Sequence, residues 1–132
     1  MSRLRVLVAE DHAAVRTNVV QLLSSAYDVV GTVSDGRALL EAIDTLEPDV
    51  LVLDLSLPVI SGIEAANILK QRKRPSKIVF MTVHNDPDFV RATRDAGALG
   101  YVLKQQMNTD LPEAIDKANA GECFTSPSVR GL

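Results

Sequence analysis

The stretch VLVLD at Val50–Asp54 decides the expected fold of this chain. Four consecutive apolar residues predict a short strand that is buried on both faces, as in a parallel sheet covered by helices. The run ends in a carboxylate, and Pro58 then prevents the strand from continuing. Because ligands bind at the carboxyl ends of parallel strands, Asp54 is placed for chemistry rather than for packing.

Segments of helical spacing alternate with four further apolar segments along the chain. The expected strands are residues 4–9, 27–33, 50–53, 77–82 and 98–103, and the expected helices are residues 12–25, 34–48, 61–72, 86–97 and 109–121. This alternation predicts an α/β fold with a parallel sheet between two layers of helices. Five such units fit a flavodoxin-like (βα)5 three-layer sandwich with the strand order 2-1-3-4-5.

The composition limits the classes of protein that fit. A chain of 132 residues with 46% hydrophobic residues is expected to form one globular domain. Its formal net charge of −3 does not favour a nucleic-acid surface. The single cysteine, Cys123, excludes an internal disulfide and favours a reducing compartment. No apolar run is long enough for a signal peptide or a spanning helix, so a cytoplasmic protein without membrane contact is expected.

Polar side chains stand where four of the expected strands end. Glu10 and Asp11 follow the first strand, Asp54 the third, Thr82 the fourth and Lys104 the fifth. In the order 2-1-3-4-5, the first, third and fourth strands are neighbours, so we expect the three carboxylates to lie together. Crowded carboxylates repel one another unless a cation lies between them.

A hard divalent cation fits this set of groups. Mg²⁺ binds a few carboxylates together with the oxygens of a substrate phosphate, and the chain lacks a histidine and cysteine ligand set for Zn²⁺. Lys104 and Thr82 would contact further phosphoryl oxygens, as phosphoryl transfer requires. A carboxylate is itself a nucleophile that forms an aspartyl-phosphate. Asp54, at the centre of the row, is the candidate.

Each of these residues has a simpler interpretation when it is taken alone. Asp54 and Asp11 could be turn residues or helix caps, Thr82 a turn hydroxyl and Lys104 a solvated charge. Four strand ends with compatible chemistry are much harder to explain in that way, which favours a single functional site.

The sequence as a whole resembles a receiver domain of a two-component response regulator, over about residues 4–120. The resemblance is carried by Glu10-Asp11, by Asp54 with Leu57-Pro58 and Gly62, by Thr82, and by Gly100-Tyr101 with Lys104. The segments Glu10–Arg16 and Asp95–Lys104 resemble the NarL/FixJ (LuxR-type) subgroup in particular.

This resemblance implies a phosphoacceptor site. Asp54 would accept a phosphoryl group from a phosphohistidine on a sensor histidine kinase or a phosphotransfer protein. Asp11, Asp54 and the backbone carbonyl of Ser56 would bind Mg²⁺, and Glu10 would act through water. The protein would catalyse only its own phosphorylation and dephosphorylation, and would not be an enzyme that acts on other molecules.

The resemblance also implies a switch. Thr82 and Lys104 would hold the phosphoryl oxygens, and a movement of Thr82 would let Tyr101 turn inward. That movement would remodel the face formed by the fourth helix, the fifth strand and the fifth helix. Phosphorylation would thus be a local change of charge that shifts the equilibrium between two conformations of this face.

Four residues bear on how this site would differ from its relatives. Gln105 stands where many receivers have a proline after a cis bond. Val83 stands where many have a smaller residue, and it would crowd the access to the phosphoryl group. Ser56 and His84 stand at the two positions at which family members tune the lifetime of the phosphoryl group.

Three other interpretations are left open at this point. A flavodoxin-like electron carrier would need a Ser/Thr/Gly-rich phosphate loop after the first strand, where two acidic residues stand. A Mg²⁺-dependent phosphatase would normally carry a second aspartate two residues after Asp54, where Ser56 stands. A phosphorylation-independent interaction module with the receiver fold is the third, and Val83 and Gln105 keep it open.

The end of the chain resembles the start of a linker. Residues 1–120 are expected to form the receiver domain, and residues 121–132 to begin a linker to a C-terminal helix-turn-helix effector domain outside this chain. DNA binding and transcription regulation are expected only through that domain, controlled by homodimerisation on activation or by release of the effector domain.

Overall fold

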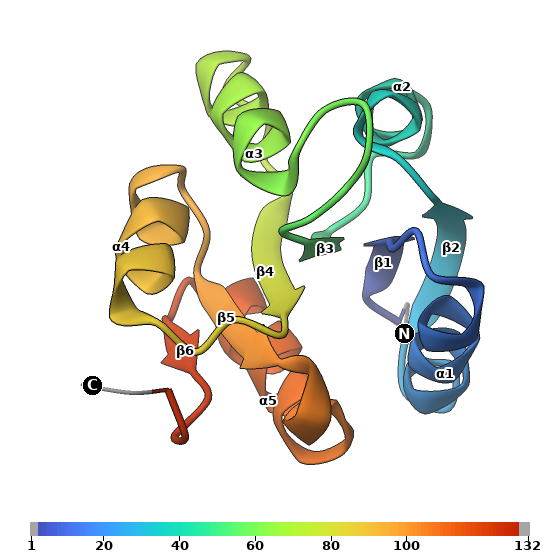
Figure 1. Cartoon of the computed structure of the whole chain (residues 1–132). Coiled ribbons are helices and arrows are strands. Elements are labelled where there is room, and N and C mark those ends of the chain that lie inside the picture. Colours follow the sequence, from blue (N-terminus) through green and yellow to red (C-terminus); the bar gives the residue numbers. More distant parts are fainter. Residues whose placement is uncertain (1–2, 130–132) are drawn as a thin grey trace.

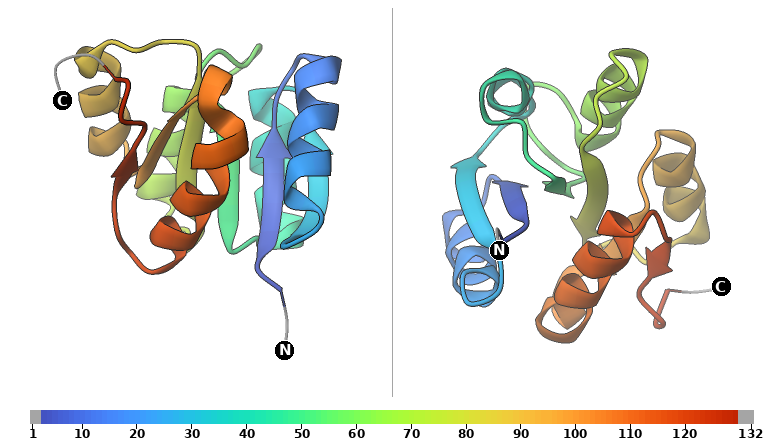
Figure 2. Two further views of the ribbon diagram at one scale, coloured as in Figure 1. Left: turned by 90° about the horizontal axis from the view of Figure 1, so that it is seen from below. Right: turned by 180° about the vertical axis from the view of Figure 1, so that it is seen from behind.

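The computed structural model of the chain describes residues 3–129, which form a parallel sheet between two layers of helices (Figures 1 and 2). The strands are β1 (Arg5–Ala9), β2 (Asp28–Val33), β3 (Val50–Asp54), β4 (Lys77–Thr82), β5 (Gly100–Leu103) and β6 (Phe124–Thr125). The helices are α1 (Ala13–Leu23), α2 (Gly36–Leu46), α3 (Gly62–Gln71), α4 (Pro87–Asp95) and α5 (Met107–Asn119), with a 3₁₀ turn η1 (Lys104–Gln106) before α5.

The strand order is β2-β1-β3-β4-β5-β6, and every neighbouring pair is parallel. The flavodoxin-like fold and the order of the first five strands are therefore confirmed. The sixth strand was not predicted, because residues 121–132 were expected to begin a linker. Residues 130–132 of that expected linker lie outside the described residues.

The core has two halves, one on each face of the sheet. Leu51, Leu53 and Phe80 point toward the layer of α2, α3 and α4, whereas Val52 and Met81 point toward α1 and α5. All five side chains are fully buried. Each contributes on the order of 1.5–3 kcal/mol relative to an exposed position. The alternation along each strand thus explains why the central strands read as continuous apolar runs.

Local capping explains where three helices begin. The side chains of Asp35, Ser61 and Asp86 each accept a hydrogen bond from a backbone N–H in the first turn of the helix that follows. The last helix begins at Met107 rather than at the expected residue 109. It begins earlier because the η1 turn leads directly into it, with the Met107 N–H donating to the Lys104 carbonyl.

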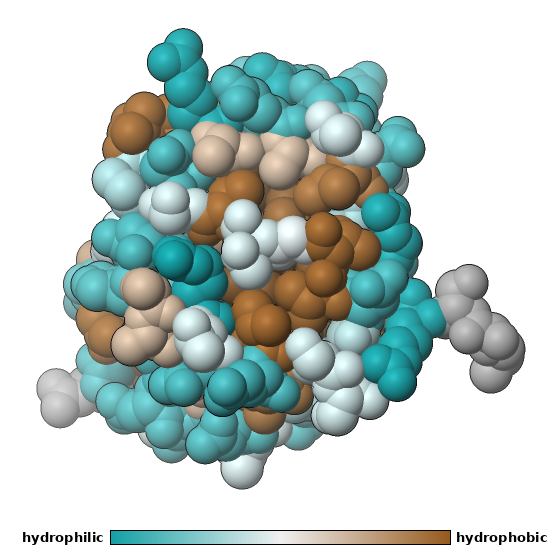
Figure 3. Space-filling view, turned by 90° about the vertical axis from the view of Figure 1, so that its right-hand side faces the viewer, coloured by the Kyte–Doolittle hydropathy of each residue, from teal (hydrophilic) through white to brown (hydrophobic). Residues whose placement is uncertain are grey.

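Figure 3 shows an apolar area on the face formed by α1, β2 and α2. The edge strand β2 runs along this face, and its residues Val29, Val30 and Val33 are half-buried. Within residues 3–129, no helix combines the length and the apolar character that crossing a bilayer requires.

Candidate functional site

Three acidic side chains meet at the carboxyl ends of β1 and β3. Potential ligand atoms of Glu10, Asp11, His12 and Asp54 all lie within 4.8 Å of one another. The in-register pairing of β1 with β3, which places Ala9 beside Leu53, brings the two strand ends level. Glu10 is fully buried and Asp54 is 3% exposed, so these carboxylates are largely withdrawn from water.

Lys104 is the cation of this cluster. Its Nζ lies 2.7 Å from Glu10 Oε1 and 3.1 Å from Asp54 Oδ2. Burial opposes the charge of Lys104, but the bonds to the two carboxylates outweigh that effect and raise its pKa. The lysine therefore stays protonated and joins the end of β5 to the ends of β1 and β3.

The two buried carboxylates differ in their electrostatics. Burial raises the pKa of Asp54 and the charge of Glu10 adds to this effect, although the Ser56 N–H and Lys104 oppose it. The Ser56 N–H donates to Asp54 Oδ1 at 3.2 Å. Burial also acts on Glu10, but the bonds from Lys104 and from the His12 N–H lower the pKa of Glu10 overall. The folded protein thus favours the ionised form of Glu10 and disfavours the ionised form of Asp54.

The donor set fits a hard divalent cation. Asp11 Oδ1 is buried and has no hydrogen-bond partner among the described residues. Three carboxylates beside one ammonium leave a formal charge of −2 when His12 is neutral. A dication would balance that charge, and carboxylate oxygens are the ligands that Mg²⁺ prefers.

Thr82 and Tyr101 both form hydrogen bonds with His84 of the β4–α4 loop. Thr82, at the end of β4, is 1% exposed, and its Oγ1 accepts a hydrogen bond from the His84 N–H at 3.2 Å. Tyr101 is fully buried, and its hydroxyl donates to the His84 carbonyl at 2.7 Å. Burial, with a smaller contribution from Asp86, raises the pKa of Tyr101 to about 12. The tyrosine therefore occupies an inward position in this structure.

The four residues singled out as variable occupy different surroundings. Ser56 is exposed on the β3–α3 loop, and Val83 is 70% exposed on the β4–α4 loop. The His84 ring stacks on Phe89 of α4, with 4.4 Å between the ring centroids and 22° between the planes. Gln105 lies in the η1 turn, and its peptide bond to Lys104 is trans.

Two further residues of the site were used above only as signs of the family resemblance. His12 Nδ1 lies 3.1 Å from Glu10 Oε2 and 3.2 Å from Asp11 Oδ1. Arg16 Nη1 donates to the Glu10 carbonyl at 2.8 Å, which holds the β1–α1 loop in place. The sequence signal for Arg16 is a basic residue one helical turn after His12, on the helix that follows Glu10 and Asp11.

Two glycines let the β3–α3 loop pack closely behind Asp54. A Cβ on Gly62 would lie 2.4 Å from the Asp54 carbonyl oxygen, and a Cβ on Gly36 would lie 2.0 Å from the Ile60 carbonyl oxygen. Real Cβ atoms do not approach backbone oxygens so closely, so glycine is required at both positions. Close backbone approach thereby sets the position of the strand end that presents Asp54.

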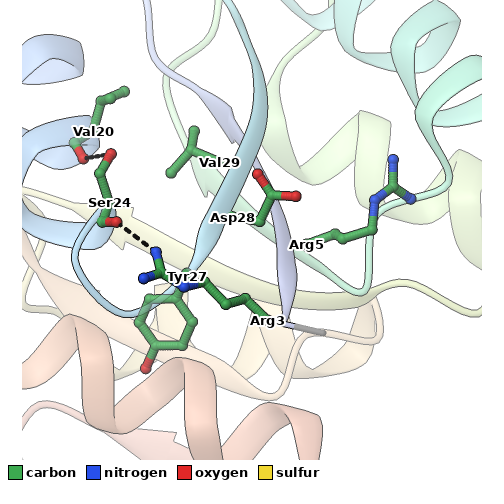
Figure 4. Close-up of a pocket in the computed structure, with 7 residues that line it drawn as sticks. All are labelled: Arg3, Arg5, Val20, Ser24, Tyr27, Asp28 and Val29. Carbon is green, nitrogen blue, oxygen red and sulfur yellow. Dashed lines mark hydrogen bonds between the residues drawn. The ribbon is translucent and has the colours of Figure 1, made fainter. Parts of the chain in front are cut away.

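A hollow lies at the other end of the sheet, where β1 and β2 begin. It has a volume of about 540 Å³ and is lined by residues such as Arg3, Ser24 and Tyr27 (Figure 4). Arg3 Nη1 donates to the Ser24 carbonyl at 2.9 Å, at the C-terminal end of α1. The guanidinium is thus already used as a helix cap, and this hollow does not include the acidic cluster.

Known proteins are similar to this chain in sequence and in fold. The family model of the response regulator receiver domain matches residues 6–116. The nitrate/nitrite response regulator protein NarL of Escherichia coli (strain K12) is 36% identical over 126 residues, which cover 94% of this chain and 58% of that protein. The chain thus spans a little over half the length of this curated relative.

Two solved structures are similar over nearly the whole chain. The two-component response regulator of the LuxR family from Aurantimonas sp. SI85-9A1 has a TM-score of 0.91 and 32% identity, and the match covers 97% of this chain and 93% of that one. The signal receiver domain of the putative response regulator NarL from Mycobacterium tuberculosis has a TM-score of 0.88 and 31% identity, with 92% and 100% covered.

Proposed function

The chain belongs to the response regulator receiver family, and from this premise we propose that Asp54 is its phosphoacceptor. One observation carries the proposal: the pocket that holds the buried Asp54 carboxylate also holds Lys104 and the acidic pair Glu10 and Asp11. A structural aspartate needs no such surroundings. A phosphoryl group needs a nucleophile, a cation for its oxygens and ligands for a metal.

The proposed reaction transfers a phosphoryl group from a phosphohistidine on a sensor histidine kinase or a phosphotransfer protein. An oxygen of Asp54 attacks the phosphorus, the P–O bond forms as the P–N bond breaks, and the imidazole leaves and takes up a proton. Lys104, which now pairs with Asp54 Oδ2 at 3.1 Å, would move to a phosphoryl oxygen. Attack by water on the aspartyl-phosphate later releases inorganic phosphate and ends the signal.

Asp11, Asp54 and the Ser56 carbonyl would hold Mg²⁺, with Glu10 acting through water. The bound ion would neutralise negative charge on the carboxylates and on the phosphoryl oxygens. The buried Asp11 Oδ1, which lies 3.2 Å from His12 Nδ1 but accepts no hydrogen bond among the described residues, supports this assignment.

Thr82 and Tyr101 are the proposed switch. On phosphorylation the Thr82 hydroxyl would donate to a phosphoryl oxygen. This movement would draw in the β4–α4 loop at His84. Because the Tyr101 hydroxyl bonds the His84 carbonyl, this movement would strengthen the inward position of Tyr101. Ser56, Val83 and His84 would set the lifetime of the phosphoryl group.

The proposed output is control of homodimerisation or of an effector domain joined to this domain in a longer protein. Tyr101 lies on β5 and packs in the same apolar cluster as Val90 of α4, so the face of α4, β5 and α5 is the proposed output surface. DNA binding would belong to the effector domain.

The test is phosphorylation by a small acyl-phosphate donor in the presence of Mg²⁺, followed by intact-mass measurement. We expect the mass of one phosphoryl group to be added to the wild type and to Asp28→Ala, an exposed carboxylate at the opposite end of the sheet, but not to Asp54→Ala. An adduct that persists in Asp54→Ala would place the phosphoacceptor elsewhere. A folded wild type that neither gains phosphate nor binds beryllofluoride would be a phosphorylation-independent interaction module.

A further inference from the structure

The segment Phe124–Val129, which we call the strap, lies along the outer edge of β5. Its first two residues form β6 and pair with Gly100 and Tyr101. The strap leaves α5, runs beside β5 and ends near α4 (Figures 1 and 2). The backbone hydrogen bonds from Phe124 N to Leu99 O and from Ser126 N to Tyr101 O are both 2.9 Å long. The strap is therefore part of the sheet.

Ser126 is the strap residue whose backbone N–H and side-chain hydroxyl are both hydrogen-bonded to neighbouring elements. It is 1% exposed. Its Oγ accepts a hydrogen bond from the Leu103 N–H at 3.0 Å and donates to Asp110 Oδ2 of α5 at 2.7 Å. With its N–H on Tyr101, Ser126 satisfies the outward backbone groups on both sides of Val102. Without the hydroxyl, the buried Leu103 N–H would lose its partner.

Two more contacts fix the strap to α4. Arg94 Nη2 of α4 donates to Thr125 Oγ1 at 2.6 Å. Val129 is 3% exposed and belongs to the same apolar cluster as Tyr101 and Val90. With the bond from Ser126 to Asp110 of α5, the strap contacts both helices beside β5, and it pairs with Tyr101, whose hydroxyl bonds the His84 carbonyl.

A short series of contacts joins the strap to Thr82, at the end of the strand that pairs with β3. The His84 N–H donates to Thr82 Oγ1 at 3.2 Å, the Tyr101 hydroxyl donates to the His84 carbonyl at 2.7 Å, and the Ser126 N–H donates to the Tyr101 carbonyl. On the same strand, Leu103 directly precedes Lys104, the cation of the site. Ser126 therefore holds β5 at Tyr101, whose hydroxyl bonds the β4–α4 loop, and at Leu103, which precedes Lys104.

We propose that Ser126 is a positioning residue of the phosphorylation site, and that the strap transmits the state of Asp54 to the chain that follows Val129. This inference rests on the proposed function, because it needs Asp54 to change state. The docked strap and the inward Tyr101 stabilise one another. Thermodynamic coupling is reciprocal, so phosphorylation tightens the strap, and loosening the strap weakens the phosphorylated state.

The first measurement is amide hydrogen exchange of the intact chain with and without beryllofluoride and Mg²⁺. We expect beryllofluoride to slow the exchange of the Leu103 and Ser126 amides severalfold in the wild type. Ser126→Ala should weaken beryllofluoride binding roughly fivefold or more, whereas Ser128→Ala, the same substitution at an exposed position of the strap, should bind as the wild type does. The difference between the amide exchange rates with and without beryllofluoride is the readout that a merely structural role of Ser126 would not change.

Tyr101→Phe provides a second variant that keeps the buried ring and removes only the hydroxyl. It should abolish most of the slowing at Ser126 even if Ser126→Ala fails to fold. The inference is overturned, and the proposed function stands, if beryllofluoride binds the wild type while the strap amides exchange at unchanged rates. If the folded wild type does not bind beryllofluoride at all, the proposed function fails and the inference fails with it.

Discussion

At the scale of single residues, Asp54 combines two opposing demands. It lies at the end of a fully buried strand, where an apolar residue would pack without cost. Burial and the nearby charge of Glu10 raise the pKa of Asp54 above its ordinary value, which means that the folded state disfavours the carboxylate. Sites of this kind exchange stability for reactivity.

Asp54→Asn should therefore stabilise the metal-free protein. The substitution removes a crowded charge, while Lys104 keeps its bond to Glu10 at 2.7 Å. We expect the free energy of unfolding to rise by about 1 kcal/mol, which corresponds to roughly 4 °C in Tm. Thermal unfolding in a chelating buffer measures this change. Added Mg²⁺ should raise the Tm of the wild type more than that of the variant. Asp28→Asn is the control, and a loss of stability in Asp54→Asn would contradict the expectation.

Tyr27 gives a prediction about alkaline pH. Its hydroxyl donates to Asp116 Oδ1 at 2.7 Å and lies 3.0 Å from the Pro112 carbonyl oxygen. Burial, together with Asp116, raises the pKa of Tyr27 well above its ordinary value. The unfolded chain loses this proton near pH ~10. The folded state then binds more protons than the unfolded state, so the contribution of Tyr27 is complete below about pH 10 and falls as the pH rises further.

Tyr27→Phe should lower the free energy of unfolding by about 1 kcal/mol at neutral pH, through the lost hydrogen bond. It should also flatten the decline of stability above about pH 10. Urea unfolding of both proteins across that range measures the two effects. Parallel pH profiles for the wild type and the variant would show that Tyr27 does not cause the decline.

At the scale of elements, the β3–α3 loop carries the backbone strain of the site. A hydrogen bond from Gly62 N to Leu55 O at 3.0 Å closes this loop, and one from Gly36 N to Pro58 O at 3.1 Å holds its middle. Between them, Val59 has a φ of 70°, which is unfavourable for a β-branched residue. Val59 is the central residue of a tight three-residue turn in which the Ile60 N–H donates to the Pro58 carbonyl at 2.8 Å, an arrangement that is strained at positive φ.

Val59→Asn should relieve that strain. Asparagine adopts positive φ more readily than valine, and Val59 is 74% exposed, so little packing is lost. We expect a gain of about 1 kcal/mol in the free energy of unfolding, measured by chemical denaturation. Val83→Asn is matched in residue type and is 70% exposed, and it should change stability by no more than about 0.5 kcal/mol. Equal effects at both positions would mean that φ is not the cause.

At the scale of the whole molecule, the folded unit extends beyond residue 120. The strap contributes a strand to the sheet and a buried side chain to the core, and its residues contact both α4 and α5. A segment that was expected to begin a linker therefore has the contacts of a structural element. Nothing in its local pattern indicates this, because a two-residue strand is too short to show periodicity.

Val129→Ala tests whether the strap stabilises the whole molecule. The side chain is 3% exposed within the apolar cluster, so truncation should lower the free energy of unfolding by about 1–3 kcal/mol. Val83→Ala, at an exposed position, should have an effect within about 0.5 kcal/mol. A residue of a solvated linker would behave like the control, and that result would return the boundary to residue 120.

The amino-acid pattern specifies the architecture and places Glu10, Asp11 and Asp54 in the acidic cluster, although it does not place His12 there. Val50–Asp54 and the other apolar runs specify buried parallel strands, and parallel strands bring their carboxyl ends to one edge of a sheet. Polar residues at the ends of these strands therefore lie at one edge of the sheet, which is why Glu10, Asp54 and Lys104 could be placed together from their positions in the chain.

The tertiary structure alone decided the contacts that depend on side-chain direction and on long separations along the chain. Examples are the pairing of Lys104 with both carboxylates, the inward position of Tyr101, and the bond between Ser126 and the Leu103 N–H. Periodicity reports only which face of its own element a residue occupies. Which distant partner meets that face is set by the packing of the complete core, and so the strap could be found only in the folded chain.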